Sequence, residues 1–330
     1  MSLTGYIAKN GNDLSFIFQS GNSGLTIGYK LIDGRDIGSI FSGYTSYLSP
    51  LSGIISSNGS DISTLFNGNS YIPLTIPGCC IWLDAADINT ITKDGNNKVS
   101  DWRDKSTSAY TFSQITGTNK PTYSTNSQNG NATISFTSAN ATYLSCSSLL
   151  AIGTSSFALF TVGRYSDNTT NMTIFAKSRF TSQEGRFFIN RDASSLNIAF
   201  VHTGGALLQG TSESYSPVGG YRMFELIVNR TEQKDYSYQN GTQLQSSTIS
   251  DSTNYADNGN TMLVGAYNNN VGTGIQSGYY LNGNVSEIIA YKSSDMTVAN
   301  RQKIEGYLAW KWGIQSRLPV GHPYLSAPPI

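Results

Sequence analysis

The feature that most constrains this chain is a series of short apolar segments that recur at roughly ten-residue spacing through its second half. Each segment is rich in β-branched and aromatic residues, and Asn, Gly, Asp or Ser separates it from the next. This pattern is typical of a β-sandwich. Asn240-Gly241, between two strand-like runs, is a strong hairpin signal. The predicted strands are residues 132–136, 156–163, 172–178, 185–190, 196–202, 221–229, 234–241, 260–267 and 284–291.

One amphipathic helix is predicted near the C-terminus, over residues 298–312. Thr297 is suited to cap its first turn, and Gly313 is suited to end it. Apolar residues at i, i+4 and i+8 make one stripe that can close a β domain. The stripe consists of Ile304, Leu308 and Trp312, with Tyr307 beside them. The side chains expected to point outward are Arg301, Lys303 and Lys311.

The N-terminal region contains a repeated unit with the pattern [N/D]-G-x-D, followed by apolar residues at i, i+3 and i+4. The three copies are residues 10–18, 33–41 and 58–66. One such unit cannot bury its own apolar face, so the units must stack on each other or on a partner. Residues 70–78, with two prolines and a glycine, resemble a linker. We therefore predict a repeat-containing anchoring segment over 1–76 and a β domain over 77–330.

Motifs at both ends of the β domain resemble those of concanavalin A-like (laminin-G-like) jelly-roll domains. The first is CIWLDAAD (80–87) with VSDWRDKS (99–106), and the last is GNVSEIIAY (283–291) with IEGYLAWKWG (304–313). Between them, residues 121–123, 134–136 and 143–144 continue the pattern. The resemblance covers residues 78–324. It implies an all-β fold, a two-sheet antiparallel jelly-roll sandwich with one C-terminal helix, preceded by the small repeat-containing segment.

Domains of this kind occur in capsid-surface, vertex or fibre proteins of phages and large nucleocytoplasmic DNA viruses, and the N-terminal repeat is similar to regions of those giant-virus proteins. The resemblance implies a non-enzymatic structural protein of the virion surface (penton or fibre), synthesised in the host cytoplasm. Its expected partners are other capsid proteins or further copies of itself as a homo-oligomer, and host glycans. The expected anchors in the shell are Phe18, Phe41 and Phe66, because buried aromatic residues dominate interface energetics.

The same fold also hosts glycoside hydrolases and free-standing lectins, so both stay open as alternatives. A retaining glycosidase needs two carboxyl groups roughly 5 Å apart. No E-x-D-x-E-like cluster exists, and Asp84 and Asp87, like Asp101 and Asp104, are three residues apart and so do not share a strand face. We interpret these aspartates as caps and turn residues at strand ends.

Histidine is too scarce for a metal cluster or a Ser-His-Asp triad, since only His202 and His322 are present. His322 lies in a Gly-His-Pro turn and is interpreted as solvated or capping. Glu287 belongs to a structural strand, and Glu305 to the closing helix. We therefore expect no catalytic residue, no cofactor and no resident metal. Calcium held by scattered loop oxygens is the alternative.

Sugar binding needs an exposed aromatic face beside Asn or Asp side chains and backbone amides. One loop offers both, and the alternative is a solvated turn whose tyrosines pack inward. The candidate glycan-binding residues are Tyr267, Asn268, Asn269, Asn270, Tyr279 and Tyr280.

The composition disfavours two other classes of partner. Lys plus Arg and Asp plus Glu are both 21, and only 13% of residues are charged. Without clustered cations, neither nucleic acid nor an anionic membrane is expected to bind. No segment approaches the roughly 20 apolar residues that cross a bilayer, and the N-terminal residues lack the signature of a signal peptide. Three cysteines, with two adjacent, fit a reducing compartment and small buried apolar roles.

Overall fold

The structure is a computed structural model of the 330-residue chain. It describes residues 72–147, 150–166, 170–177, 186–192, 195–201, 207–210, 220–250, 252, 254–255, 261–269, 274–292 and 296–329. Residues 72–329 belong to one unit. The N-terminal repeats, with Phe18, Phe41 and Phe66, lie outside the described residues, as does His202.

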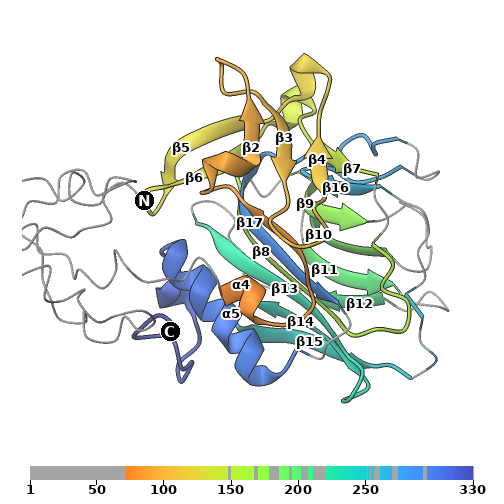
Figure 1. Cartoon of the computed structure of the whole chain (residues 1–330). Helices are drawn as coiled ribbons and strands as arrows, with labels where there is room; N and C mark the ends of the chain where they lie inside the picture. The colour runs from red at the N-terminus through yellow and green to blue at the C-terminus, as the bar shows by residue number, and fades with distance from the viewer. Residues whose placement is uncertain are drawn as a thin grey trace, which may run out of the picture. The chain divides into compact units, whose positions relative to one another are not determined.

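Two antiparallel sheets form the sandwich (Figure 1). The 8-stranded sheet consists of β1 (Cys79–Asp84), β5 (Thr122–Gln128), β6 (Asn131–Phe136), β8 (Phe157–Tyr165), β13 (Arg222–Asn229), β14 (Lys234–Gln239), β15 (Thr242–Thr248) and β17 (Gly283–Lys292). The 9-stranded sheet consists of β2 (Ile91–Lys93), β3 (Val99–Arg103), β4 (Thr111–Ser113), β7 (Leu144–Cys146), β9 (Met172–Lys177), β10 (Arg186–Asp192), β11 (Ser195–Val201), β12 (Leu207–Gly210) and β16 (Met262–Val264).

The strand order mixes distant parts of the chain. In the 8-stranded sheet the order is β15-β14-β13-β8-β17-β6-β5, and β1 pairs with β17 beyond the end of β6. In the 9-stranded sheet the order is β12-β11-β10-β9-β16-β7-β4-β3-β2. Every pairing is antiparallel. The predicted two-sheet antiparallel jelly-roll sandwich is confirmed.

The helices are few and mostly short. They are α4 (Ile72–Thr75), η3 (Ile88–Thr90), η4 (Gly117–Asn119), η5 (Ser138–Asn140), α5 (Val298–Lys311) and η6 (Gln315–Arg317). The predicted C-terminal helix is confirmed as α5. The hydroxyl of Thr297 accepts the Asn300 N–H at 3.2 Å, which satisfies a donor that the first turn would leave unpaired. Gly313, at φ 64°, ends the helix in the left-handed region that glycine adopts at low cost.

Two apolar clusters hold these layers together. The larger one fills the space between the sheets and includes Trp102, Phe112, Phe175 and Phe224. The second lies between the 8-stranded sheet and α5, and includes the predicted stripe. Ile304, Tyr307, Leu308 and Trp312 are each 0% exposed. The helix is therefore a lid over the outer face of one sheet, as Figure 1 also shows.

All nine strands predicted from the apolar segments are present, with small shifts at their ends. The hairpin at Asn240-Gly241 joins β14 to β15, and both residues have positive φ (51° and 76°). Two residues of positive φ are what a tight two-residue hairpin requires. The hairpin prediction is therefore confirmed.

The linker interpretation of residues 70–78 does not hold for 72–76. Residues 72–75 form α4, and Ile76, which directly follows it and is 6% exposed, packs in the cluster beneath α5. The hydroxyl of Tyr291 donates to the carbonyl of Pro73 at 2.9 Å. Contacts with a strand and with the closing helix make this segment part of the sandwich. The division of the chain into two domains stays a prediction.

Candidate functional site

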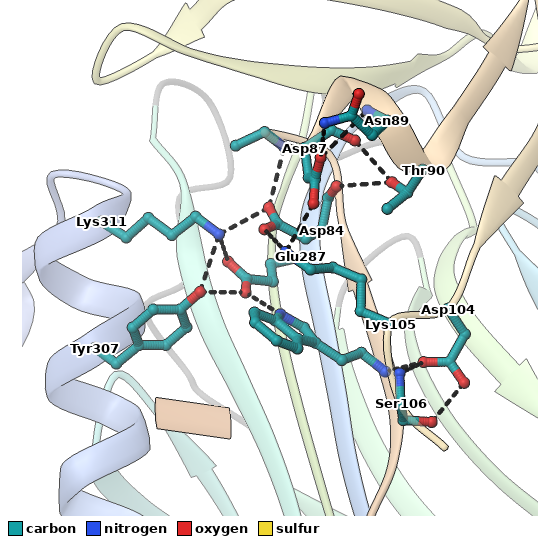
Figure 2. Close-up of polar contacts among 12 residues, drawn as sticks. Asp84, Asp87, Asn89, Thr90, Asp104, Lys105, Ser106, Glu287, Tyr307 and Lys311 are labelled. Carbon is teal, nitrogen blue, oxygen red and sulfur yellow. Dashed lines mark hydrogen bonds and ion pairs between the residues drawn. The ribbon is translucent and has the colours of Figure 1, made fainter. Parts of the chain in front are cut away.

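The pairing of β1 with β17 places two carboxylates, Asp84 and Glu287, directly opposite each other. Like charges at facing positions on neighbouring strands are destabilising. Lys311, in the last turn of α5, compensates them. Its Nζ lies 2.7 Å from Oδ1 of Asp84 and 2.8 Å from Oε2 of Glu287 (Figure 2). We call these three residues the buried triad. The contacts of Lys311 with the two carboxylates show that it does not point outward, contrary to the expectation from the sequence.

Glu287 is enclosed by hydrogen-bond donors. The indole N–H of Trp82 donates to Oε1 and that of Trp312 donates to Oε2, both at 2.7 Å, and the Tyr307 hydroxyl donates to Oε1 at 2.8 Å. The side chain is 0% exposed. Burial raises the pKa of Glu287 above its usual value, against the opposing charge of Lys311. Because protein donors occupy both oxygens, this carboxylate is not available to a soluble ligand.

A second lysine extends the triad. Nζ of Lys105 lies 3.1 Å from Oδ2 of Asp84 and 3.0 Å from Oδ2 of Asp87 (Figure 2). Burial alone would raise the pKa of Asp84, but Lys311 and Lys105 hold it below the usual range. Asp87 also caps η3, where it accepts the Asn89 N–H at 3.2 Å. The predicted capping role is confirmed for Asp87 and also for Asp84, which accepts the Ala86 N–H at the end of β1 and in addition belongs to an ion-pair network.

The other aspartate pair binds only protein groups. Asp104 accepts the backbone N–H of Trp82 and the Ser106 hydroxyl, both at 2.6 Å. Asp101 accepts the Ser113 hydroxyl at 2.7 Å across the pair β3 and β4. The predicted role at a strand end is confirmed for Asp104, which directly follows β3, but not for Asp101, which lies in the middle of β3 and bonds across to β4.

A second group of buried carboxyls lies nearer the N-terminal end of α5. Oε1 of Glu225 accepts the Gly241 N–H at 2.9 Å, while Glu305 pairs with Arg301 and with Nε2 of His322 at 2.8 Å. Burial, and then the facing Glu305 charge, raise the pKa of Glu225 well above its usual value. Burial would also raise the pKa of Glu305, but hydrogen bonds from His322 and Glu225 and the Arg301 charge lower it. The two pKa values therefore move apart, that of Glu225 upward and that of Glu305 downward.

His322 is buried, 7% exposed, so the solvated alternative does not hold, whereas its bond to a backbone N–H fits the capping alternative. Its Nδ1 accepts the Tyr324 N–H at 3.2 Å, so Nε2 carries the hydrogen that binds Glu305. Tyr324 in turn packs against Gly306, where a Cβ would meet the tyrosine Cβ at 2.6 Å. These contacts fasten the C-terminal segment onto α5. Arg301, expected to point outward, has a side chain only 12% exposed and also belongs to this group.

The predicted glycan-binding loop, between β16 and β17, divides into buried and half-buried residues. Tyr267 and Asn268 are 3% and 1% exposed. The Tyr267 ring lies 5.3 Å from Phe188 and 5.5 Å from Tyr279, on the 9-stranded sheet. For Tyr267 the inward-packing alternative holds. Asn270 lies outside the described residues.

Tyr280 is half-buried and pairs with a residue that the sequence interpretation did not assign to the site. Its ring centroid lies 6.4 Å from that of Tyr143, with the two planes at 39°. The loop carrying Tyr143 is bonded to a neighbouring loop. The Tyr143 N–H donates to the Asn119 carbonyl at 3.2 Å, and the Gln114 side chain donates to the Tyr143 carbonyl at 3.4 Å. Ile115, in this neighbouring loop, is 91% exposed. We call Tyr143 and Tyr280 the tyrosine pair.

The cysteines are free thiols in this fold. Cys79 and Cys80 are half-buried in β1 and Cys146 is buried. Burial, followed by the charge of Asp104, raises the pKa of Cys80 to about 12. A thiol with so high a pKa is a weak nucleophile, because the thiolate is the reactive form.

Within the described ranges, no group of three or more His, Cys, Asp or Glu side chains could hold a metal ion. Calcium bound through scattered loop oxygens stays an untested alternative. In the same part of the chain, no helix has the length and apolarity to cross a membrane.

No protein-family model and no curated protein sequence matches the chain. Several solved structures are similar in fold. One is the binding domain of Paraclostridial Mosquitocidal Protein 1, with 12% identity and a TM-score of 0.50 over 70% of this chain and 52% of that domain. Others are the botulinum neurotoxin serotype D binding domain (10%, TM-score 0.47, 73% and 52%) and the CBM40 of Ruminococcus gnavus IT-sialidase (11%, TM-score 0.33, 44% and 80%). The match therefore spans about half of each toxin domain, and at such identities it establishes the β-sandwich fold alone.

Proposed function

We propose that this protein is a non-catalytic, glycan-binding β-sandwich displayed on a virion surface. The observation that carries the proposal is the tyrosine pair: two half-buried rings on loops that are hydrogen-bonded near their base. Sugars bind to aromatic faces that are already in place, with nearby amides supplying hydrogen bonds. The side-chain amides of Asn119 and Gln114 donate to backbone carbonyls at and just before Tyr143, which holds this ring in place for a ligand.

The state of the carboxylates supports a binding protein rather than a hydrolase. A retaining glycosidase needs two carboxyl groups that flank the scissile bond and are open to substrate. Two close carboxyl pairs, Asp84 with Glu287 and Glu225 with Glu305, are buried beneath α5 and held by protein donors. A third pair, Asp84 with Asp87, is bridged by Lys105. Incubation with plant, algal and bacterial polysaccharides should release no reducing sugar above a buffer blank. Hydrolysis abolished by one Asp or Glu substitution would favour the hydrolase.

A glycan array followed by titration calorimetry tests the binding proposal on the full chain. Sugar-competable binding is expected for the wild type, with a loss of about 5- to 150-fold in Tyr143→Ala and in Tyr280→Ala. This range assumes that a sugar gains on one ring what a stacked nucleobase gains, roughly 1–3 kcal/mol. Tyr236→Ala is the matched control, since Tyr236 is a half-exposed tyrosine on the other sheet. Binding that the tyrosine-pair variants leave unchanged would contradict the proposed site.

The virion role rests on the sequence resemblance and on the repeats of the N-terminal segment. We propose that residues 1–71 anchor the protein to the shell through Phe18, Phe41 and Phe66, with the sandwich projecting, in one or more copies. A chain that begins at Ile72 keeps α4 and should fold and bind glycans normally, yet fail to enter particles. Normal incorporation of this shortened chain into virions would contradict the anchoring role without affecting the glycan site.

A further inference from the structure

The buried triad brings an amine and a carboxyl group into contact across 227 residues of sequence. Nζ of Lys311 is 2.7 Å from Oδ1 of Asp84, and Oε2 of Glu287 is 2.8 Å from the same nitrogen. We propose that Lys311 and Asp84 condense to an intramolecular isopeptide bond, and that Glu287 relays the protons. The product would join the last turn of α5 covalently to the end of β1.

The site meets the two geometric conditions for such a condensation. First, folding fixes the reacting atoms in contact, which turns a bimolecular reaction into a unimolecular one. Second, the site excludes water. Glu287 is 0% exposed, the Asp84 side chain 7% and the Lys311 side chain 16%. Trp82 and Trp312 flank the triad and bind Glu287. A dry site favours a reaction that expels water and protects the amide from hydrolysis.

The carboxyl group of Asp84 is also supplied with donors on both oxygens. Lys105 Nζ lies 3.1 Å from Oδ2, and the backbone N–H of Ala86 lies 3.1 Å from Oδ1 (Figure 2). When a nucleophile adds to Cγ, negative charge develops on an oxygen, and preorganised donors stabilise it. Lys105 is placed to do this on Oδ2, while Oδ1, the oxygen nearest Lys311, is the one that leaves.

The step balances without any further reactant. The ammonium of Lys311 gives one proton to Glu287, and in a dry site the exchange of two charges for two neutral groups costs little. The amine lone pair then forms the N–C bond to Cγ of Asp84. The second proton leaves the nitrogen, and Glu287 passes both protons to Oδ1, which departs as water. Glu287 returns to its starting state, and one ammonium and one carboxylate have become an amide.

The state that competes with the isopeptide bond is an ordinary ion pair of Lys311 with the two carboxylates, and the charges around the site favour it. Lys311 faces Asp84, Glu287 and the Tyr307 hydroxyl, and burial by itself would lower its pKa, yet the two carboxylates raise it. Burial raises the pKa of Glu287, which suits it to accept a proton. The same geometry thus serves either an ion pair or its condensation product, and these two states differ in mass.

Mass spectrometry of the full-length, denatured and reduced protein distinguishes them. The expected mass is below the sequence mass by one water. Trypsin should leave the bond after Lys311 uncut and yield a branched peptide that joins Lys311 to Asp84. An intact mass equal to that of the sequence would overturn the proposal. So would a water loss that maps elsewhere, such as a succinimide at an Asn-Gly or Asp-Gly step, which mild base reverses.

Three substitutions assign the roles within the triad. Lys311→Arg removes the nucleophile and keeps a cation, so it should restore the full sequence mass. Glu287→Gln keeps the size and an acceptor oxygen but removes the relay, and should do the same. Asp84→Asn should lose one ammonia in place of one water. Lys93→Arg, at an exposed lysine of β2 outside the triad, is the control and should still show the water loss. A Lys311→Arg chain that remains lighter by one water would refute the assignment.

Discussion

The outer faces of the two sheets are covered in different ways, although the sheets share one apolar core. On the 8-stranded sheet, α5 covers a large cluster in which charged side chains are inserted between tryptophans and tyrosines. On the 9-stranded sheet, a small cluster of Ala176, Phe188, Tyr267 and Tyr279 is seen among the described residues. Near it, the tyrosine pair stays partly open to solvent.

The contrast assigns stability to the outer face of the 8-stranded sheet and ligand recognition to the tyrosine pair. Burying charge costs free energy unless it is paired and hydrogen-bonded, and the 8-stranded face meets both conditions. The charged groups on this face are already bonded to protein groups beneath α5, so they are not available to a ligand. The two rings of the tyrosine pair, by contrast, are only half-buried and stay partly open to a ligand. Substitutions on the two faces should therefore differ in what they change, and the predictions below run from the largest effect on stability to the smallest.

Lys311→Met should be the most damaging change, because it leaves Asp84 and Glu287 facing each other without their shared cation. Removing one partner of a buried ion pair costs about 3–5 kcal/mol. Lys93→Met is the control, since Lys93 is exposed and donates to the Asn97 side chain without pairing with a carboxylate. Urea denaturation of the full chain gives the free energy of unfolding. A loss below about 1 kcal/mol for Lys311→Met would mean that the triad is not part of what holds α5.

Leu308→Ala should destabilise the protein by about 2–5 kcal/mol, because it leaves a cavity in the cluster beneath α5. Leu308 is 0% exposed and no charge is involved, so this variant separates packing from ion pairing on the same face. Val298→Ala, at a residue of α5 that is 57% exposed, is the control. Thermal unfolding monitored by circular dichroism is sufficient. A marginal effect would show that the helix contributes little to the fold.

The strands and α5 could be predicted because their residues carry a local signal: β-branched and aromatic runs between turns, and one apolar stripe with a cap. The polar edge strand β15, whose sequence is TQLQSST, carries no such apolar signal. The hairpin signal at Asn240-Gly241 indicates it, and backbone hydrogen bonds to β14 hold it in the sheet. The buried triad was missed for two reasons. The pairing of Asp84 with Glu287 depends on a strand register that spacing does not encode. A helical-wheel argument assigned Lys311 to solvent by charge alone, although the long apolar stem of lysine allows burial beside carboxylates.

Glu225→Gln should stabilise the protein as the pH rises. Burial, and then the charge of Glu305, raise the pKa of Glu225 in the folded protein. The protonated Glu225 side chain therefore contributes fully to stability below the ordinary pKa of glutamate, and this contribution is lost as the pH rises through the raised pKa. Glutamine is neutral throughout and can still accept the Gly241 N–H. The gain over wild type should grow as the pH rises above the ordinary pKa of a glutamate, by up to about 1.4 kcal/mol per pH unit until the raised pKa is passed. Glu232→Gln, at an exposed carboxylate, is the control, and an equal gain there would contradict the assignment.

Tyr280→Ala should change stability least and recognition most, in contrast to Tyr267→Ala in the same loop. Tyr267 is 3% exposed and packs between Phe188 and Tyr279, so its truncation should cost about 3–5 kcal/mol. Tyr280 is half-buried and loses mainly its contact with Tyr143, which is worth about 0.5–1.5 kcal/mol. Paired melting and glycan-binding measurements on both variants check this. If Tyr280→Ala melted as early as Tyr267→Ala, the tyrosine pair would be part of the core, and the division between a stabilising face and a recognition face would fail at this loop.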